Sequence, residues 1–170
     1  MAPLDEIHRS GCPGASAGPE TVQCAPGSLG MRYLGIDFGE ARIGLALSDP
    51  EGRFAVPLKT LTRQNDRAAA REIAEIARTE EVGRLVLGEP VGLDGTRGEA
   101  AERVRRFGKK LETATGLPVE LIEEALTSVA ADERLREAGV DTRKDRSRID
   151  AVAAQILLQD ALDRRARTTD

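Results

Sequence analysis

Acidic residues stand at the ends of several predicted strands and helices of this 170-residue chain. Asp37 falls in an apolar run, Glu89 follows a second run, Glu123 and Glu124 follow a third, and Asp150 lies in the first turn of the last predicted helix. Carboxylates gathered in one place repel one another, and a hard divalent cation with oxygen ligands relieves that repulsion. Two such ions can activate a water molecule and stabilise the leaving oxygen in phosphodiester cleavage. The pattern therefore predicts a carboxylate site for Mg²⁺ or Mn²⁺, with two ions bound.

The available residue types exclude other chemistry. The single histidine, His8, and both cysteines, Cys12 and Cys24, lie in the first 30 residues, outside the predicted domain. The formal net charge of -4 gives no global attraction to nucleic acid, so a nucleic-acid partner requires a local basic patch. Aromatic residues make up only 2% of the chain, which disfavours base stacking as the main binding mode.

The first 30 residues differ in composition from the rest of the chain. They are rich in Gly, Pro, Ser and Ala without a helical or strand period, which predicts a disordered tail over 1–30 and one domain over 31–170. The chain has no apolar run of membrane-spanning length and no basic-then-apolar leader. We therefore expect a cytoplasmic protein without a membrane partner.

The elements that must position the carboxylates follow from the apolar periodicity. Strands are predicted over 32–38, 42–48, 54–61, 84–88 and 119–122, and helices over 65–81, 98–115, from Thr127 or Ser128 to Gly139, and 148–166. This order predicts an α/β fold: a mixed five-stranded sheet, three antiparallel strands and then two parallel ones, with helices on both faces. The crevice outside the carboxyl ends of parallel strands is the usual site, and Glu89 and Glu124 would face it.

Four segments resemble, in the same order, the motifs of the YqgF/RuvX family of candidate Holliday junction resolvases. The resemblance spans about residues 31–165 and rests on Leu-Gly-Ile-Asp-Phe-Gly at 34–39 with 42–44 and 48–49, on 88–90 with 94–95, on 123–128, and on 150–159. It implies an RNase H-like fold, metal-dependent nuclease activity and a role in maturing the precursor of 16S rRNA. It also implies that Asp37, Glu124 and Asp150 are the catalytic residues and metal ligands.

Two positions depart from the family pattern. Glu89 stands where the family has Leu, and Ala125 stands where it has Arg. Glu89 is predicted either to add a fourth metal ligand or to point to solvent. Ala125 removes a phosphate contact or ion pair that the family would supply.

Other interpretations of the acidic residues are structural. Asp37 could be a buried structural residue in a turn, and Glu124 could be a surface acid that favours the dipole of the following helix. Asp150 could belong to a capping box that begins at Ser147.

Basic residues near the predicted site suggest phosphate contacts. Those assigned to nucleic-acid binding are Arg42, Arg143, Lys144, Arg146 and Arg148. Arg42 could instead pair with Asp49 or Glu40. The cations of the helix predicted over 98–115 indicate a solvated helix face; they are Arg103, Arg105, Arg106, Lys109 and Lys110.

The pattern leaves three functional classes open. The first is a nuclease acting on an RNA precursor, at the 5′ end of pre-16S rRNA, or on branched or single-stranded DNA as a junction resolvase. A resolvase would need a homodimer with two symmetric sites. The second is a non-catalytic nucleic-acid or ribosome-associated factor. The third is a phosphate-binding protein, because the first hairpin also resembles a phosphate motif of the actin/hexokinase superfamily; those proteins use two such domains, and this chain has length for one.

Overall fold

The computed structural model describes residues 31–91, 98–124, 137 and 146–169, with side chains described for all of these except Glu124, Arg146 and Thr169. The predicted tail over 1–30 and nearly all of the helix predicted from Thr127 or Ser128 to Gly139 lie outside the described residues. The described helices contain none that is long and apolar enough to cross a bilayer.

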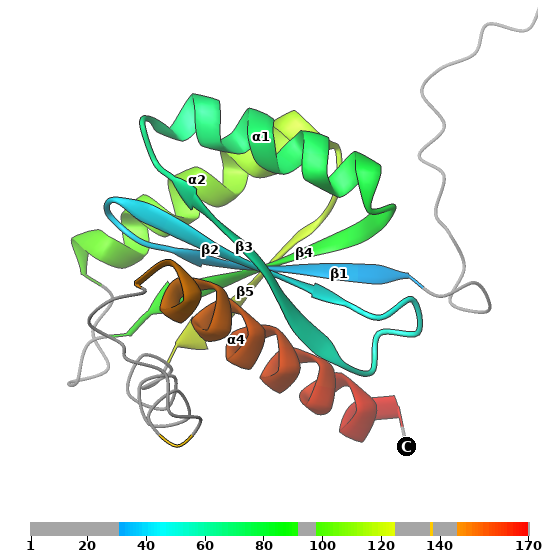
Figure 1. The fold of residues 1–170 in the computed structure, drawn as a ribbon. Helices are drawn as coiled ribbons and strands as arrows, with labels where there is room; N and C mark the ends of the chain where they lie inside the picture. Colours follow the sequence, from blue (N-terminus) through cyan, green and yellow to red (C-terminus); the bar gives the residue numbers. More distant parts are fainter. Residues whose placement is uncertain (1–30, 92–97, 125–136, 138–145, 170) are drawn as a thin grey trace, which may run out of the picture.

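One five-stranded sheet forms the middle layer of the structure (Figure 1). The strands are β1 (Arg32–Phe38), β2 (Arg42–Ser48), β3 (Ala55–Thr62), β4 (Val82–Pro90) and β5 (Val119–Glu124), and the helices are α1 (Asp66–Thr79), α2 (Glu99–Thr115) and α4 (Arg146–Thr169). The strand order is β3-β2-β1-β4-β5. The pairs β1–β2 and β2–β3 are antiparallel, and the pairs β1–β4 and β4–β5 are parallel. The predicted mixed sheet is confirmed.

Helices cover both faces of this sheet, with α1 and α2 on one side and α4 on the other (Figure 1). Successive strand residues point to opposite faces. In β1, Leu34 and Ile36 are fully buried in the core beneath α1 and α2. Gly35 and Asp37 therefore face α4. The face beneath α4 has its own core, which includes Val86 and Leu158.

Helix α4 lies very close to the sheet because two strand positions, Gly35 in β1 and Gly44 in β2, have no side chain. A Cβ atom at Gly35 would stand 2.7 Å from Leu158 Cβ and 2.9 Å from the carbonyl oxygen of Ala154. Real Cβ atoms almost never approach other heavy atoms that closely, so a larger residue would push the helix away. The close contact of α4 with β1 thus depends on glycine.

Side chains of α4 cover the start of the outer strand β3. The amide nitrogen of Ala55 in β3 donates to Gln159 Oε1 at 2.9 Å, and the carbonyl oxygen of Ala55 accepts from Gln155 Nε2, also at 2.9 Å. An edge strand otherwise presents unpaired backbone groups that can template pairing with another chain. Here α4 satisfies both backbone groups of Ala55.

Candidate active site

Asp37 lies near the end of β1, on the side of the sheet that α4 covers. It pairs in register with Gly44 of β2, and its side chain is half-buried. Directly opposed residues of antiparallel strands have Cα atoms about 4.5–5.5 Å apart. Whatever lies over Gly44 is therefore a neighbour of Asp37.

The N-terminal part of α4, at Asp150 and Ala151, lies over Gly44. A Cβ atom at Gly44 would stand only 1.8 Å from the carbonyl oxygen of Asp150 and 2.3 Å from its carbonyl carbon. The missing side chain at position 44 is thus what allows the helix backbone to rest on the sheet beside Asp37. In this way the structure places the backbone of Asp150 over Gly44, the register partner of Asp37, although the two acids are far apart along the chain.

Arg42 is the polar partner of Asp150. Its Nε donates to Asp150 Oδ2 at 2.5 Å, and the side chains are 37% and 25% exposed. Arg42 lies two residues before Gly44 in β2, and so on the same face of the sheet. The suggested pairing of Arg42 with Asp49 or Glu40 is not what the structure has.

Those two acids have other partners. Asp49 accepts from the backbone N–H groups of Phe54 and Arg53, and the first of these contacts is the main cause that holds the pKa of its carboxyl below the usual value. Glu40 accepts from Arg103 of α2 at 3.3 Å.

The capping box predicted for Ser147 is also not formed as proposed. Helix α4 has begun by Arg146, so Ser147 lies inside the helix and is not its N-cap. The carbonyl oxygen of Ser147 accepts from Thr60 Oγ1 of β3 at 2.5 Å. This contact and the Arg42–Asp150 pair both attach the start of α4 to neighbouring strands.

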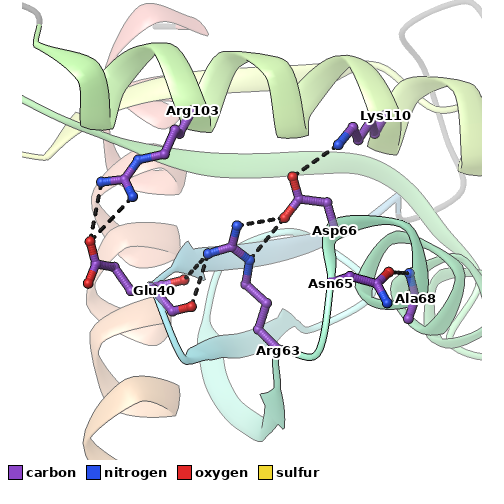
Figure 2. Close-up of polar contacts among 8 residues, drawn as sticks. Glu40, Arg63, Asn65, Asp66, Ala68, Arg103 and Lys110 are labelled. Carbon is purple, nitrogen blue, oxygen red and sulfur yellow. Dashed lines mark hydrogen bonds and ion pairs between the residues drawn. The ribbon is translucent and has the colours of Figure 1, made fainter.

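The turn between β1 and β2 is held from the other side of the sheet by Arg63 (Figure 2). Its guanidinium donates to the carbonyl oxygens of Gly39 and Glu40, at 3.3 and 3.0 Å. It also donates to Asp66 at 2.6 Å, and Lys110 of α2 donates to the same carboxylate at 3.0 Å. Burial alone would raise the pKa of Asp66, but Arg63 and Lys110 together keep it below the usual value. This network fixes the hairpin that carries Asp37 and Arg42.

Sequence reasoning did not identify Arg63. Its contacts reach Gly39 and Glu40, which lie 24 and 23 residues earlier in the chain, and no spacing rule connects these positions.

Glu89 lies on the opposite face of the sheet from Asp37. In β4 it follows Leu85 and Leu87 in alternation, and both of these are buried in the core beneath α1 and α2. Its side chain is 4% exposed and accepts from Arg105 Nε of α2 at 2.5 Å. The solvent-facing alternative for Glu89 is therefore wrong, and its position gives no support for a ligand of the same ion as Asp37. Arg105 itself is 35% exposed, so this cation of the predicted solvated helix face reaches solvent and also pairs with a buried acid.

Glu124 is the last residue of β5, in register with Pro90 of β4. It follows Ile122 by two residues, and Ile122 is buried in the core beneath α4. Among the remaining predicted phosphate contacts, Arg148 is exposed on the first turn of α4 and Arg146 is the first residue of that helix. Arg143 and Lys144 lie outside the described residues.

The described side chains supply two carboxylates at this place. Among them, no group of three or more His, Cys, Asp or Glu side chains is arranged to hold a metal ion. Asp37 and Asp150 nonetheless provide the oxygen donors that a hard divalent cation prefers. A complete ligand set thus requires a further side chain, and Glu124 is the predicted one.

Comparison with known proteins agrees with the sequence motifs. A family model described as RuvX, Holliday junction resolvase, matches residues 31–164. A candidate pre-16S rRNA nuclease of Anaeromyxobacter dehalogenans (strain 2CP-C) is 47% identical over 136 residues, which cover 80% of this chain and 99% of that protein. A protein of the same name from Maridesulfovibrio salexigens is 42% identical over 134 residues, covering 79% and 99%.

Solved structures show the same fold. The T. thermophilus RuvC structure in complex with a Holliday junction substrate superposes with a TM-score of 0.53 at 18% identity, over 81% of this chain and 97% of RuvC. That likeness confirms the RuvC-like RNase H fold. From the family match over 31–164 and relatives at 42–47% identity, the chain belongs to the RuvX family.

Proposed function

We propose that this protein is a divalent-metal-dependent nuclease that hydrolyses phosphodiester bonds in processing the 5′ end of pre-16S rRNA. The observation that supports the chemistry is the placement of the Asp150 backbone over Gly44, the residue that pairs in register with Asp37. The names of the relatives at 42–47% identity support the substrate.

Asp37, Asp150 and Glu124 would hold the ion or ions. A strand alternates faces with each residue, so position 124 belongs to the face where Ile122 packs under α4. Asp37 is on that face of β1, and Asp150 comes down to it from the helix. We therefore assign the ion to carboxylates from three elements, because carboxylate oxygens are the donors suited to Mg²⁺ or Mn²⁺. We omit Glu89 from this set because it pairs with Arg105 on the other face.

Bound cations would supply two things: a water activated for attack and compensation of the charge on the leaving oxygen. The chain's own residues supply positioning. Arg63 holds the turn that follows Asp37, and Thr60 holds the turn of α4 that carries Asp150. Arg42 keeps the Asp150 carboxylate oriented toward β2. Arg42 and Arg148 lie at the site with donors that a phosphate oxygen can accept from, so we assign them, with Arg143, Lys144 and Arg146, to the substrate backbone.

The test is a substrate panel. Purified protein is incubated with an end-labelled RNA that spans the 5′ maturation site of 16S rRNA, a single-stranded DNA and a four-way DNA junction, each with Mg²⁺, Mn²⁺ or EDTA. We expect the RNA to be cleaved only when metal is present, and we expect this activity to co-elute with the protein on size exclusion. Preferred cleavage of the junction by a species of dimer mass would favour the resolvase alternative, and binding without cleavage of any substrate would favour the non-catalytic factor.

Replacing Arg42 with Gln is expected to tighten Mn²⁺ binding by about three- to tenfold. The guanidinium at 2.5 Å competes with a cation for Asp150, and a half-exposed ion pair is worth about 0–1 kcal/mol, to which the removed charge repulsion adds. The measurement is the Mn²⁺ concentration that gives half of the maximal thermal shift, which requires no activity. Arg53→Gln, which removes an exposed charge paired with Glu51, serves as the control. Weaker Mn²⁺ binding in Arg42→Gln would mean that the pair orients Asp150 for the metal more than it competes.

A further inference from the structure

The groove between α1 and α2 lies in the helical layer opposite to α4 (Figure 1). It is an open depression of about 790 Å³. Small residues line it from both helices: Ala70 and Ala74 from α1, and Ala114 from α2. The groove exists because alanines stand where the two helices face each other, and longer side chains there would fill it.

Cations line this groove without matching acids. Arg67 and Arg71 line it from α1, and Lys109 and Lys110 line it from α2. The acid among the lining residues, Glu75, is already paired with Arg78 at 2.5 Å. The local charge is therefore strongly positive on a chain whose formal net charge is -4.

Three of the four cations have no acidic partner within the described part of the chain. Lys110 donates to Asp66 at 3.0 Å and belongs to the network that holds the β1–β2 turn (Figure 2). Arg67, Arg71 and Lys109 are exposed, and the described residues give them no ion pair. Arg67 and Arg71 are four residues apart on one helix, so they point along the same face.

We propose that this α1–α2 groove binds the phosphodiester backbone of RNA, as a second contact surface separate from the catalytic face. Unpaired arginines and lysines are the side chains that neutralise phosphates, and such contacts dominate non-specific affinity. A lining of alanines accepts ribose or base faces without selecting a sequence. Because the groove and Asp37 lie on opposite sides of the sheet, it would hold a segment of the substrate away from the bond that is cut. This inference rests on the proposed nuclease function for the identity of the polyanion.

The test is RNA binding in EDTA, where metal-dependent cleavage cannot occur. The groove variant combines Arg67→Gln, Arg71→Gln and Lys109→Gln. The control variant combines Arg53→Gln, Arg164→Gln and Arg167→Gln, which remove the same net charge from exposed positions before β3 and at the end of α4. The probe is a fluorescent single-stranded RNA of about 40 nucleotides, longer than the roughly 4–16 nucleotides of one single-strand site.

We expect the groove variant to bind this RNA about tenfold more weakly near physiological salt and to lower the slope of log K against log salt by about 2, since each lost single-strand contact removes about 0.7. The control variant is expected to stay within about twofold of wild type, as distant exposed charges are screened. Equal losses in the two variants, or no loss in the groove variant, would overturn the proposal.

Cleavage separates this proposal from the proposed function. In Mn²⁺, the groove variant is expected to have a higher KM and an unchanged kcat for the long RNA. For an RNA of about 6 nucleotides, which a single site accommodates, kcat/KM is expected to stay at the wild-type value. A lower kcat on the short RNA would contradict the proposal that the groove contacts the substrate away from the catalytic site. If wild type cuts no RNA but the groove variant alone loses RNA binding, the nuclease proposal fails and the groove proposal stands.

Discussion

Asp37→Asn is expected to reduce metal-dependent RNA cleavage by about a thousandfold or more, which corresponds to about 4 kcal/mol of transition-state stabilisation. The substitution keeps the shape of the side chain and removes its negative charge. An uncharged amide is a weak ligand for a hard cation, and Asp37 is the carboxylate of β1, beside the backbone of Asp150. The measurement is the single-turnover rate on the labelled RNA at saturating Mn²⁺.

The matched control for Asp37→Asn is Asp160→Asn. Asp160 lies on the same helix as Asp150, is 48% exposed and pairs with Arg164 at 2.7 Å. It should keep the wild-type rate, because surface ion pairs contribute little and Asp160 lies nearly three turns beyond Asp150 along α4. The free energy of unfolding of Asp37→Asn should stay within about 1 kcal/mol of wild type. Undiminished cleavage in Asp37→Asn would point to a contaminating nuclease and leave the non-catalytic interpretation standing.

Gly44→Ala is expected to lower the free energy of unfolding by about 3 kcal/mol and the cleavage rate by about a hundredfold or more. A Cβ atom at this position would stand 1.8 Å from the Asp150 carbonyl oxygen, and a backbone atom cannot rotate out of the way as a side chain can. The segment of α4 at Asp150 must therefore move off the sheet. Misplacement of a reacting group by about 1 Å is enough for a hundredfold loss of rate. Urea unfolding and single-turnover cleavage measure the two effects.

Gly98→Ala provides the control for the added methyl group. None of the described residues has an atom within 4 Å of a Cβ atom at Gly98, and its φ of -86° is accessible to alanine. We expect stability within about 1 kcal/mol of wild type, because alanine is a poorer N-cap of α2 than glycine, and full activity. Wild-type stability in Gly44→Ala would show that α4 does not rest on β2 at this position.

Much of the fold could be predicted because local patterns agree with the tertiary arrangement. The bounds of β1 and β2 matched the prediction, since both are apolar runs that end at a tight turn. The strand predicted over 84–88 was too short. Val82 and Pro90 extend β4 because they pair with Arg32 and Glu124 on neighbouring strands, and such pairing does not show in the hydrophobicity of the segment.

The contacts within the site could not be predicted in the same way. Arg42 and Asp150 are 108 residues apart, and Arg42 has acids much nearer in sequence. Glu89 looked like a site residue because it lies near the end of a strand. The face of the sheet to which it points follows from the alternation of side chains along β4, in which Glu89 shares the face of Leu85. Its partner there, Arg105, comes from helix α2. A motif identifies which carboxylates occur, whereas the register of the sheet decides which of them can meet.

The docking of α4 onto Gly35 and Gly44 has a consequence for the order in which the molecule gains its chemistry. Asp37 and the whole sheet precede α4 along the chain, so a nascent polypeptide emerging from the ribosome has the sheet before it has Asp150. Until α4 packs down, the sheet face and both backbone groups of Ala55 stay uncovered. Synthesis thus delays Asp150, the last of the three proposed metal ligands along the chain, until the sheet and the helices α1 and α2 have been made.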